Sequence, residues 1–263
     1  MVSWGGAPMG SDGLYPGKGV AMVMDGEGAA PGGPAGARRA RGRALEAACL
    51  AAPPAVLVAA VLAGGAWAVP ALAVAAASVG LVLAGWERSV PALRQLLPAV
   101  TLAAAATAGR ILLAAVPDVK PVSAVVILCG ACLGRRPGFL CGALAALASN
   151  LFFGQGMWTP WQMYAWGLMG YVAGALADRG LLARRGALCA YGFLSCMAYG
   201  AVLDAYTAVG FVRPLTAASL LGCWAASIPF DVVHGLSTVA FLLAVWVPWG
   251  RAIRRTVTRY GLR

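Results

Sequence analysis

The stretch SNLFFGQGMWTPWQM, residues 149–163, lies between two apolar segments and has the character of neither. It combines side-chain amides, residues that interrupt helices, and two tryptophans: Asn150, Gln155, Gln162, Gly154, Gly156, Pro160, Trp158 and Trp161. A plain turn between membrane helices needs no such combination. Aromatic surfaces and hydrogen-bonding amides at the mouth of a helix bundle are what a small-molecule site requires. The stretch therefore predicts apolar helices with a ligand site at one end.

The composition indicates an integral membrane protein. The chain has 263 residues, of which 61% are hydrophobic and only 11% charged, with a mean hydropathy of +0.79. Soluble domains average about 25% charged residues. The formal net charge is +11, but the basic residues lie in the connections between apolar segments, which is typical of a topology signal. We therefore predict contact with the lipid bilayer and no nucleic-acid partner.

The apolar segments predict an all-α fold with two helices followed by six, since a membrane span needs about 20 apolar residues. A weaker amphipathic piece covers 217–227, and 122–134 and 138–153 are short for spans. The predicted spans are 48–63, 70–86, 96–116, 122–134, 138–153, 161–177, 187–206 and 230–249. The predicted divisions are a disordered cytoplasmic tail at 1–47, an extra transmembrane pair at 48–94, a six-helix core at 95–250 and a basic cytoplasmic tail at 251–263.

Alternation of these spans separates the charges by side. Of the 20 basic residues, all but Arg110, Lys120 and Arg213 fall on one side. Basic residues favour the cytoplasmic side of membrane proteins. We therefore expect both termini to be cytoplasmic and residues 149–163 to face outwards.

Three groups of polar residues on the outer half are candidates for chemistry. Asp231 and His234 are three residues apart and share a helix face, and intramembrane ionisable groups usually face a bundle interior. They form either a supporting hydrogen-bonded pair or direct ligand contacts. Arg110 pairs with Asp231 or Asp118, or receives an anionic ligand group. The connection PDVKP, residues 117–121, suits a gate beside a pocket as well as a plain tight turn, with Asp118 and Lys120 as its charged members.

Enzyme and metal signatures are absent from the sequence. It contains no P-loop, HExxH or GxSxG motif, so we predict no catalytic activity. The seven cysteines fall in or beside apolar segments, where they pack as small apolar side chains, and no ligand spacing suggests a metal. We predict neither a metal nor a cofactor.

Small residues recur at the spacing of helix ridges. Gly138, Gly142 and Ala146 lead to Asn150, and Gly170 and Gly174 form a GxxxG pattern. Such ridges let helices approach closely in lipid. A third ridge on the alanine-rich segment 96–116 includes Ala104 and Ala108, and it either packs within the chain or docks a separate membrane subunit.

The blocks FFGQGMWTPWQM (152–163) and SIPFDVVHGLS (227–237) resemble the substrate-specific S component of energy-coupling factor (ECF) vitamin transporters. The resemblance covers about 95–250. It implies a six-helix S-component bundle in a bacterial cell membrane, with a vitamin held near the outer face beneath the loops 117–121 and 150–160. The site residues expected on this basis are Asn150, Gln155, Trp158, Trp161, Gln162, Tyr164, Asp231, His234 and Arg110, with Asp118 and Lys120 in the gate loop.

The resemblance also implies partners. The first helix of the family's bundle docks a transmembrane coupling subunit through an AxxxA pattern, which Ala104 and Ala108 match, and two cytoplasmic ATPases complete the transporter. The vitamin remains open between flavin-like, cobalamin-like and other ligands. The alternatives are a stand-alone secondary transporter, although no internal repeat supports one, and an intramembrane enzyme using Asp231, His234 and Arg110. The extra pair at 48–94 lies outside the resemblance; it braces the bundle, modifies docking or is a fused remnant.

Overall fold

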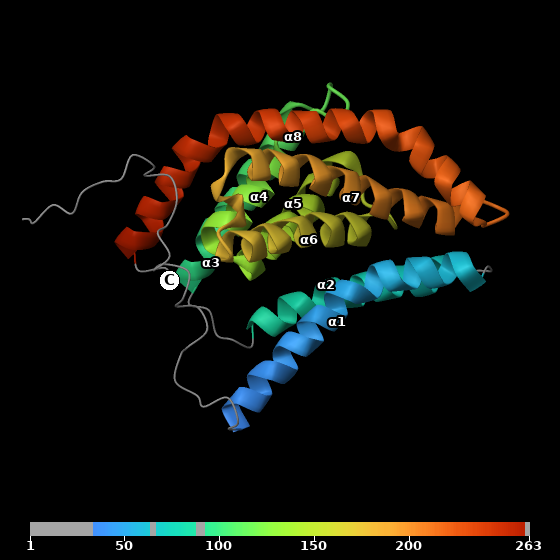
Figure 1. Cartoon of the computed structure of the whole chain (residues 1–263), viewed down its shortest axis with the longest axis horizontal. Coiled ribbons are helices and arrows are strands. Elements are labelled where there is room, and N and C mark those ends of the chain that lie inside the picture. The colour runs from blue at the N-terminus through green and yellow to red at the C-terminus, as the bar shows by residue number, and fades with distance from the viewer. Residues whose placement is uncertain (1–33, 64–66, 88–92, 261–263) are drawn as a thin grey trace, which may run out of the picture.

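The computed structural model describes residues 34–63, 67–87 and 93–260. These residues form α-helices and one short 3₁₀ helix, and no strand occurs among them, which confirms the all-α prediction (Figure 1). The helices are α1 Pro34–Ala63, α2 Ala68–Glu87, α3 Leu93–Leu112, α4 Val122–Leu133, α5 Arg135–Phe153, α6 Thr159–Asp178, η1 Leu181–Ala183, α7 Arg185–Phe211 and α8 Ala217–Tyr260. Parts of α1, α5, α7 and α8 are long and apolar enough to cross a membrane. The chain is a multi-pass membrane protein.

Helix α4 lies at the centre of the bundle. Eleven of its 12 residues are buried, and it packs against α3, α5, α6, α7 and α8. At 1.5 Å per residue it is about 18 Å long, shorter than the roughly 30 Å hydrocarbon core. A helix that falls short of spanning is tolerated because the surrounding helices, rather than lipid, enclose it. Its shortness matches the prediction for 122–134, whereas α5 is longer than the predicted 138–153.

Glycines allow α4, α5 and α6 to cross closely. Gly134 is the single residue between α4 and α5, and its φ of +106° is readily available to glycine. A Cβ added at Gly138 would lie 2.4 Å from the Gly170 carbonyl oxygen, and one added at Gly142 would lie 2.3 Å from the Trp166 carbonyl oxygen. The ridges predicted on α5 and α6 are therefore intrachain packing surfaces.

Helix α8 differs from the prediction because it is continuous over 44 residues. The piece expected at 217–227 and the span expected at 230–249 are one helix that contains Pro229 and Pro248. Proline removes one backbone hydrogen bond and bends a helix without necessarily ending it. Figure 1 shows α8 curving over the other helices of the bundle.

The boundaries of the two predicted tails also change. The tail expected at 1–47 falls outside the described residues up to residue 33, and from Pro34 onwards the chain is helical. At the other end α8 continues through most of 251–263, as far as Tyr260. Helix-favouring alanine and arginine in both regions extend the neighbouring helices.

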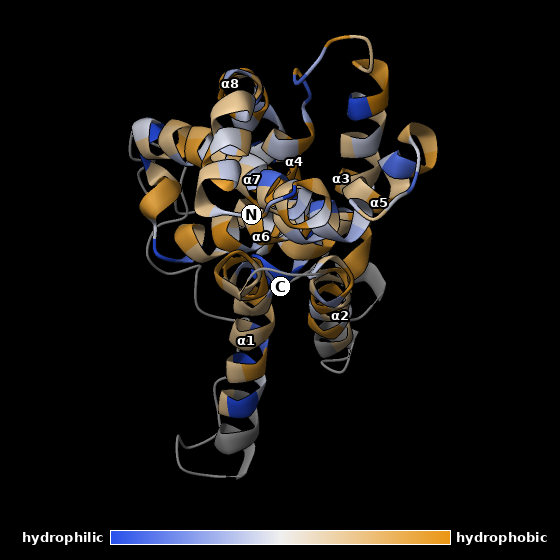
Figure 2. Cartoon of the chain, turned by 90° about the vertical axis from the view of Figure 1, so that its right-hand side faces the viewer, coloured by the Kyte–Doolittle hydropathy of each residue, from blue (hydrophilic) through white to orange (hydrophobic). Residues whose placement is uncertain are grey.

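Helices α1 and α2 lie side by side against one flank of the bundle (Figures 1 and 2). They pack mainly on α6 and α7, while α3 packs on α4 and α5. Figure 2 shows hydrophobic residues along most helices and hydrophilic residues in turns towards the start of α1. The extra pair therefore covers a face of the bundle that α3 does not use.

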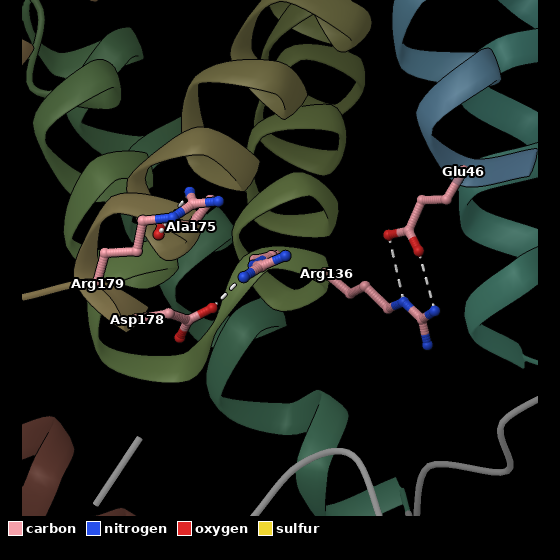
Figure 3. Close-up of polar contacts among 6 residues, drawn as sticks. Glu46, Arg136, Ala175, Asp178 and Arg179 are labelled. Atoms are coloured by element: carbon pink, nitrogen blue, oxygen red, sulfur yellow. Dashed lines mark hydrogen bonds and ion pairs between the residues drawn. The ribbon is translucent and has the colours of Figure 1, made fainter. Parts of the chain in front are cut away.

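One end of the bundle, which we call the basic end, carries the connections α4–α5 and α6–α7. There Arg136 of α5 contacts Glu46 of α1 at 3.0 Å, and Arg135 contacts Asp178 of α6 at 2.8 Å (Figure 3). Arg179 extends the same group of basic side chains by donating to the Ala175 carbonyl. The Arg136–Glu46 contact ties the extra pair to the bundle.

Candidate ligand-binding site

The opposite end of the bundle carries a connected group of polar side chains that we call the Arg110 cluster: Arg110, Ser149, Asn150, Thr159 and Gln162. Arg110 lies in the last turn of α3. Its Nη1 donates to Ser149 Oγ at 2.5 Å and to Asn150 Oδ1 at 2.8 Å. The contact joins α3 to the end of α5, where Ser149 and Asn150 are buried.

The guanidinium of Arg110 determines how the amides of Asn150 and Gln162 are oriented. A guanidinium only donates, so the Asn150 oxygen faces Arg110 and its nitrogen faces away. That nitrogen donates to Thr159 Oγ1 at 3.1 Å and to Gln162 Oε1 at 2.8 Å. The Gln162 amide nitrogen is then a donor on the side of Tyr199, with which Gln162 interacts. The cluster therefore presents donors, which suits a ligand rich in carbonyl or anionic oxygens.

Aromatic rings surround the guanidinium. Arg110 Cζ lies 4.6 Å from the centroid of the Phe153 ring and 4.9 Å from that of Trp166. Trp166 stands 4.7 Å from Tyr199, whose ring meets His234 edge-on at 5.4 Å. Flat rings beside fixed donors are the usual lining of a site for a heterocycle.

His234 and Trp166 share one partner on the central helix. His234 Nε2 lies 2.8 Å from Ser123 Oγ, and Trp166 Nε1 donates to the same oxygen at 3.0 Å. Since Ser123 accepts from the indole, its own proton is available to the histidine nitrogen. Helix α4 thus fixes two rings beside the Arg110 cluster.

The connection 113–121 lies beside the same end of the bundle. Lys120 Nζ donates to the carbonyls of Leu113 and Val116 in the turn that follows α3, and Asp118 adopts a left-handed conformation with φ 55°. Burial raises the pKa of the Asp118 carboxyl, and Lys120 offsets part of that rise. Burial likewise lowers the pKa of the Lys120 ammonium, an effect that Asp118 opposes and Arg110 reinforces. The two predicted gate residues are therefore neighbours that act on each other.

The loop between α5 and α6 is held by Gln155. Its Nε2 donates to the Leu147 carbonyl at 2.9 Å, and its Oε1 accepts from Thr159 Oγ1 at 2.8 Å. Gly154 ends α5 with a φ of +99°, which turns the chain into this loop. The Trp158 side chain is 42% exposed and its ring packs over Gly156. Gln155 and Trp158 thus border the Arg110 cluster in the loop that covers it.

Two predicted site residues lie elsewhere. Trp161 is fully buried and stacks on Tyr206 of α7 at 5.8 Å, in a core shared with α1 and α2. Tyr164 donates its hydroxyl to the Leu50 carbonyl of α1 at 2.5 Å. Both lie on the face of α6 towards the extra pair. Gln162 follows Trp161 directly but points elsewhere, because consecutive side chains on a helix differ in direction by about 100°. The structure therefore does not bring them to the Arg110 cluster.

The predicted pairs involving Asp231 also differ. Asp231 accepts from Ser227 Oγ at 3.0 Å, and the same hydroxyl contacts Asp204 of α7. His234 pairs instead with Ser123, and no ion pair joins Arg110 to Asp231 or Asp118 among the described residues. Asp231 and His234 share a face of α8 but are not hydrogen-bonded to each other. Asp231 shares Ser227 with Asp204 of α7, whereas His234 contacts Ser123 of α4.

Sequence reasoning omitted several residues that the structure places at this end: Ser123, Ser149, Phe153, Thr159, Trp166 and Tyr199. Trp166 carried a usable signal, because it is four residues after Gln162 and so shares its helix face. Ser123 and Tyr199 carried none, since each lies on another helix within an apolar segment.

A cavity of about 280 Å³ lies outside the Arg110 cluster. Its lining is almost entirely apolar and comes from α1, α7 and α8, including Leu57, Ala205 and Trp224. It provides no donors to match a polar ligand.

Ala104 and Ala108 both lie on the exposed face of α3, together with Leu97 and Thr101. Neither α1 nor α2 packs substantially against α3. The alanine ridge therefore does not serve packing within the described bundle.

Comparison with known proteins agrees with this geometry. The family model for the ECF-type riboflavin transporter, S component, matches residues 93–247, which is more than half of the chain. The chain belongs to this family. The match includes every residue of the Arg110 cluster and leaves out α1 and α2. No curated protein and no solved structure matches the chain. As an ECF S component the protein is a transporter subunit for vitamin uptake and not an enzyme, so the enzymatic alternative is wrong.

Proposed function

We propose that this S component captures a flavin at the end of the bundle that carries the Arg110 cluster. The observation that carries the proposal is the guanidinium of Arg110 and the amide of Gln162, both oriented by Asn150, beside the rings of Trp166 and Tyr199. A flavin has a flat conjugated ring system with two carbonyl oxygens on one edge. Donors and stacking surfaces of this kind complement both features.

The direction of capture follows from the charges. Most basic side chains lie at the other end, and Figure 3 shows Arg136 and Arg179 among them. The positive-inside rule places such an end in the cytoplasm. The Arg110 cluster then faces the outside of a bacterial cell, where a scarce vitamin is collected, and both termini are cytoplasmic.

Energy for transport comes from partners in this proposal. The exposed alanine ridge of α3, Ala104 and Ala108, docks the transmembrane coupling subunit of an ECF module, which carries two cytoplasmic ATPases. Small residues on an exposed helix face let another helix approach closely in lipid. The extra pair α1–α2 lies on α6 and α7 and leaves this ridge accessible.

The test of ligand capture uses the purified full-length chain. Native mass spectrometry identifies a co-purified vitamin, and quenching of flavin fluorescence measures riboflavin binding. A bound flavin supports the proposal. A cobalamin-like or other vitamin in the mass spectrum, with no flavin binding, contradicts it.

Coupling is tested separately by uptake with and without an ECF module. Ala104→Leu should abolish module-dependent uptake and leave riboflavin binding intact, because the larger side chain blocks close approach of a partner helix. Ala240→Leu on the exposed face of α8 is the matched control. Uptake by the chain alone, driven by an ion gradient, would instead identify a secondary transporter.

A further inference from the structure

The guanidinium of Arg110 has unused hydrogen-bonding capacity. Arginine offers five N–H donors and no acceptor. Both hydrogen bonds of Arg110 come from Nη1, to Ser149 Oγ and Asn150 Oδ1. Among the described residues, nothing accepts from Nε or Nη2. Three N–H groups therefore remain, and two of them, Nε–H and one on Nη2, share one edge of the guanidinium.

The charge of Arg110 also lacks a counterion. Two ion pairs occur among the described residues, and they join Arg135 to Asp178 and Arg136 to Glu46 at the basic end. Asp231 is engaged by Ser227 on α8. Arg110 is half-buried between neutral groups, where an unpaired charge is costly.

The available edge has the geometry for side-on recognition. Nε and Nη2 point in parallel, and this pair of donors matches two oxygens of a carboxylate or phosphate. The two bonds from Nη1 to α5 fix the guanidinium, and the Phe153 and Trp166 rings contact it at 4.6 and 4.9 Å. The fork is therefore pre-oriented rather than free to rotate.

Other groups at this end favour negative charge. Lys120 lies within electrostatic range of Arg110 and carries a second positive charge, and the Gln162 nitrogen adds a neutral donor. Asp118 is the acidic residue near Lys120, and burial disfavours its charged form. Two cations, Arg110 and Lys120, therefore lie within range of each other at this end, and Lys120 already has Asp118 as a nearby carboxylate.

We propose that the transported molecule carries an oxyanion that pairs side-on with Nε and Nη2 of Arg110, and that its preferred form is a phosphorylated flavin. The inference rests on the proposed capture of a flavin and adds the charge class of the substrate. A phosphate monoester supplies two suitably spaced oxygens and up to two negative charges. Riboflavin, which has the same ring system without the phosphate, is the neutral reference.

The experiment compares riboflavin with flavin mononucleotide by fluorescence quenching of the purified full chain. We expect flavin mononucleotide to bind at least about tenfold more tightly, which corresponds to about 1.4 kcal/mol. This preference should shrink at high salt, because the interaction is ionic. Arg110→Gln should abolish the preference, and Arg110→Lys, which keeps the charge without the fork, should retain part of it.

Arg213→Gln is the matched control. Arg213 lies at the same end of the bundle but donates to the carbonyls of Val209 and Val212, so its loss should leave the ratio of the two affinities unchanged. If Arg110→Gln fails to fold, the wild-type ratio, its salt dependence and Arg110→Lys decide the question.

The outcomes separate the two proposals. Riboflavin binding that equals or exceeds that of flavin mononucleotide overturns the oxyanion inference and leaves flavin capture standing. A preference that survives Arg110→Gln also overturns the inference. Failure of both flavins to bind overturns the proposed function and the inference together.

Discussion

Two adjacent faces of α6 contact different parts of the molecule, although their residues come from the same short stretch of sequence. Trp161 and Tyr164 face the extra pair α1–α2, where one stacks on α7 and the other reaches the Leu50 carbonyl. Gln162 and Trp166 face the Arg110 cluster and Ser123. One motif therefore contains residues for attachment and residues for binding. Substitutions on the first face should change stability, and those on the second should change ligand affinity.

The largest loss of stability is expected at the close crossing of α5 and α6, because this crossing positions both faces of α6. Gly170→Leu places a side chain where even a Cβ would lie 2.2 Å from the Gly138 carbonyl oxygen. We expect at least about 4 kcal/mol of destabilisation, because the clash is with the backbone of α5, which cannot move aside as a flexible side chain can. Thermal unfolding of detergent-purified protein measures it. Gly222→Leu, at a position open to space, is the control, and equal stability of the two variants would contradict the close crossing.

Trp161→Ala tests the attachment face. The indole is fully buried, and we expect a loss of about 3 kcal/mol in the free energy of unfolding, at the low end for a tryptophan because lipid competes for the vacated contacts. Flavin affinity should change by less than about twofold. A large loss of affinity at unchanged stability would return Trp161 to the ligand site.

Asn150→Leu tests the binding face. It leaves one Arg110 bond without an acceptor and Gln162 Oε1 without its donor. Without Asn150 the Arg110 guanidinium and the Gln162 amide must be re-oriented when the flavin binds, at a cost of about 1–3 kcal/mol, so flavin binding should weaken by roughly 30-fold. Asn150→Asp keeps an acceptor for Arg110 but loses both donated bonds, and it should also weaken binding. Titration of flavin fluorescence measures the affinity of each variant. Unchanged affinity in both variants would show that the Asn150 amide is not part of the ligand site.

Tyr164→Phe makes the attachment test narrower. The change removes only the hydroxyl that donates to Leu50 and keeps the ring. We expect about 1 kcal/mol of destabilisation with flavin affinity unaltered. Limited proteolysis of α1 alongside thermal unfolding provides the measurement. An effect on affinity without one on stability would contradict the assignment of faces.

The smallest effect is expected at the basic end. Glu46→Gln removes the ion pair with Arg136, whose side chain is 37% exposed (Figure 3). Surface pairs contribute about 0–1 kcal/mol and are screened by salt, and we place this pair in that range because its arginine side is open to solvent, although the Glu46 side chain is only 11% exposed. A double-mutant cycle with Arg136→Gln at two ionic strengths gives the coupling free energy. A coupling well above this range would make the pair a principal attachment of α1.

Much of the fold was predictable from the sequence because lipid imposes simple requirements on length and polarity. The all-α class, the order of the helices and the short α4 follow from apolar segments and glycine spacing. The continuity of α8 was not predictable, since Pro229 is compatible with either a break or a bend. The helical start of α1 was expected to be a disordered tail because of the glycine and proline content of residues 1–47, and it is helical because its alanines and arginines continue the helix of the apolar residues that follow.

The site was predictable only in part, for a geometric reason. Asn150, Gln162 and Arg110 come together as a set, and amides in an apolar chain are conspicuous. The hydrogen-bond partners of Arg110, Asp231 and His234 were not predictable. Each partner is set by how another helix packs against the residue, which the sequence of the residue's own helix does not show. Periodicity assigns a residue to a face of its own helix and says nothing about the neighbour of that face.

The burial of α4 makes it a reporter of motion in the whole bundle. After its first turn its backbone amides are hydrogen-bonded within the helix, and all but one of its 12 residues are buried. Deuterium can reach them only when the surrounding helices separate, so their exchange rate counts such openings. Mass spectrometry of peptides from residues 122–133 would then time the opening of the transporter subunit without any attached label.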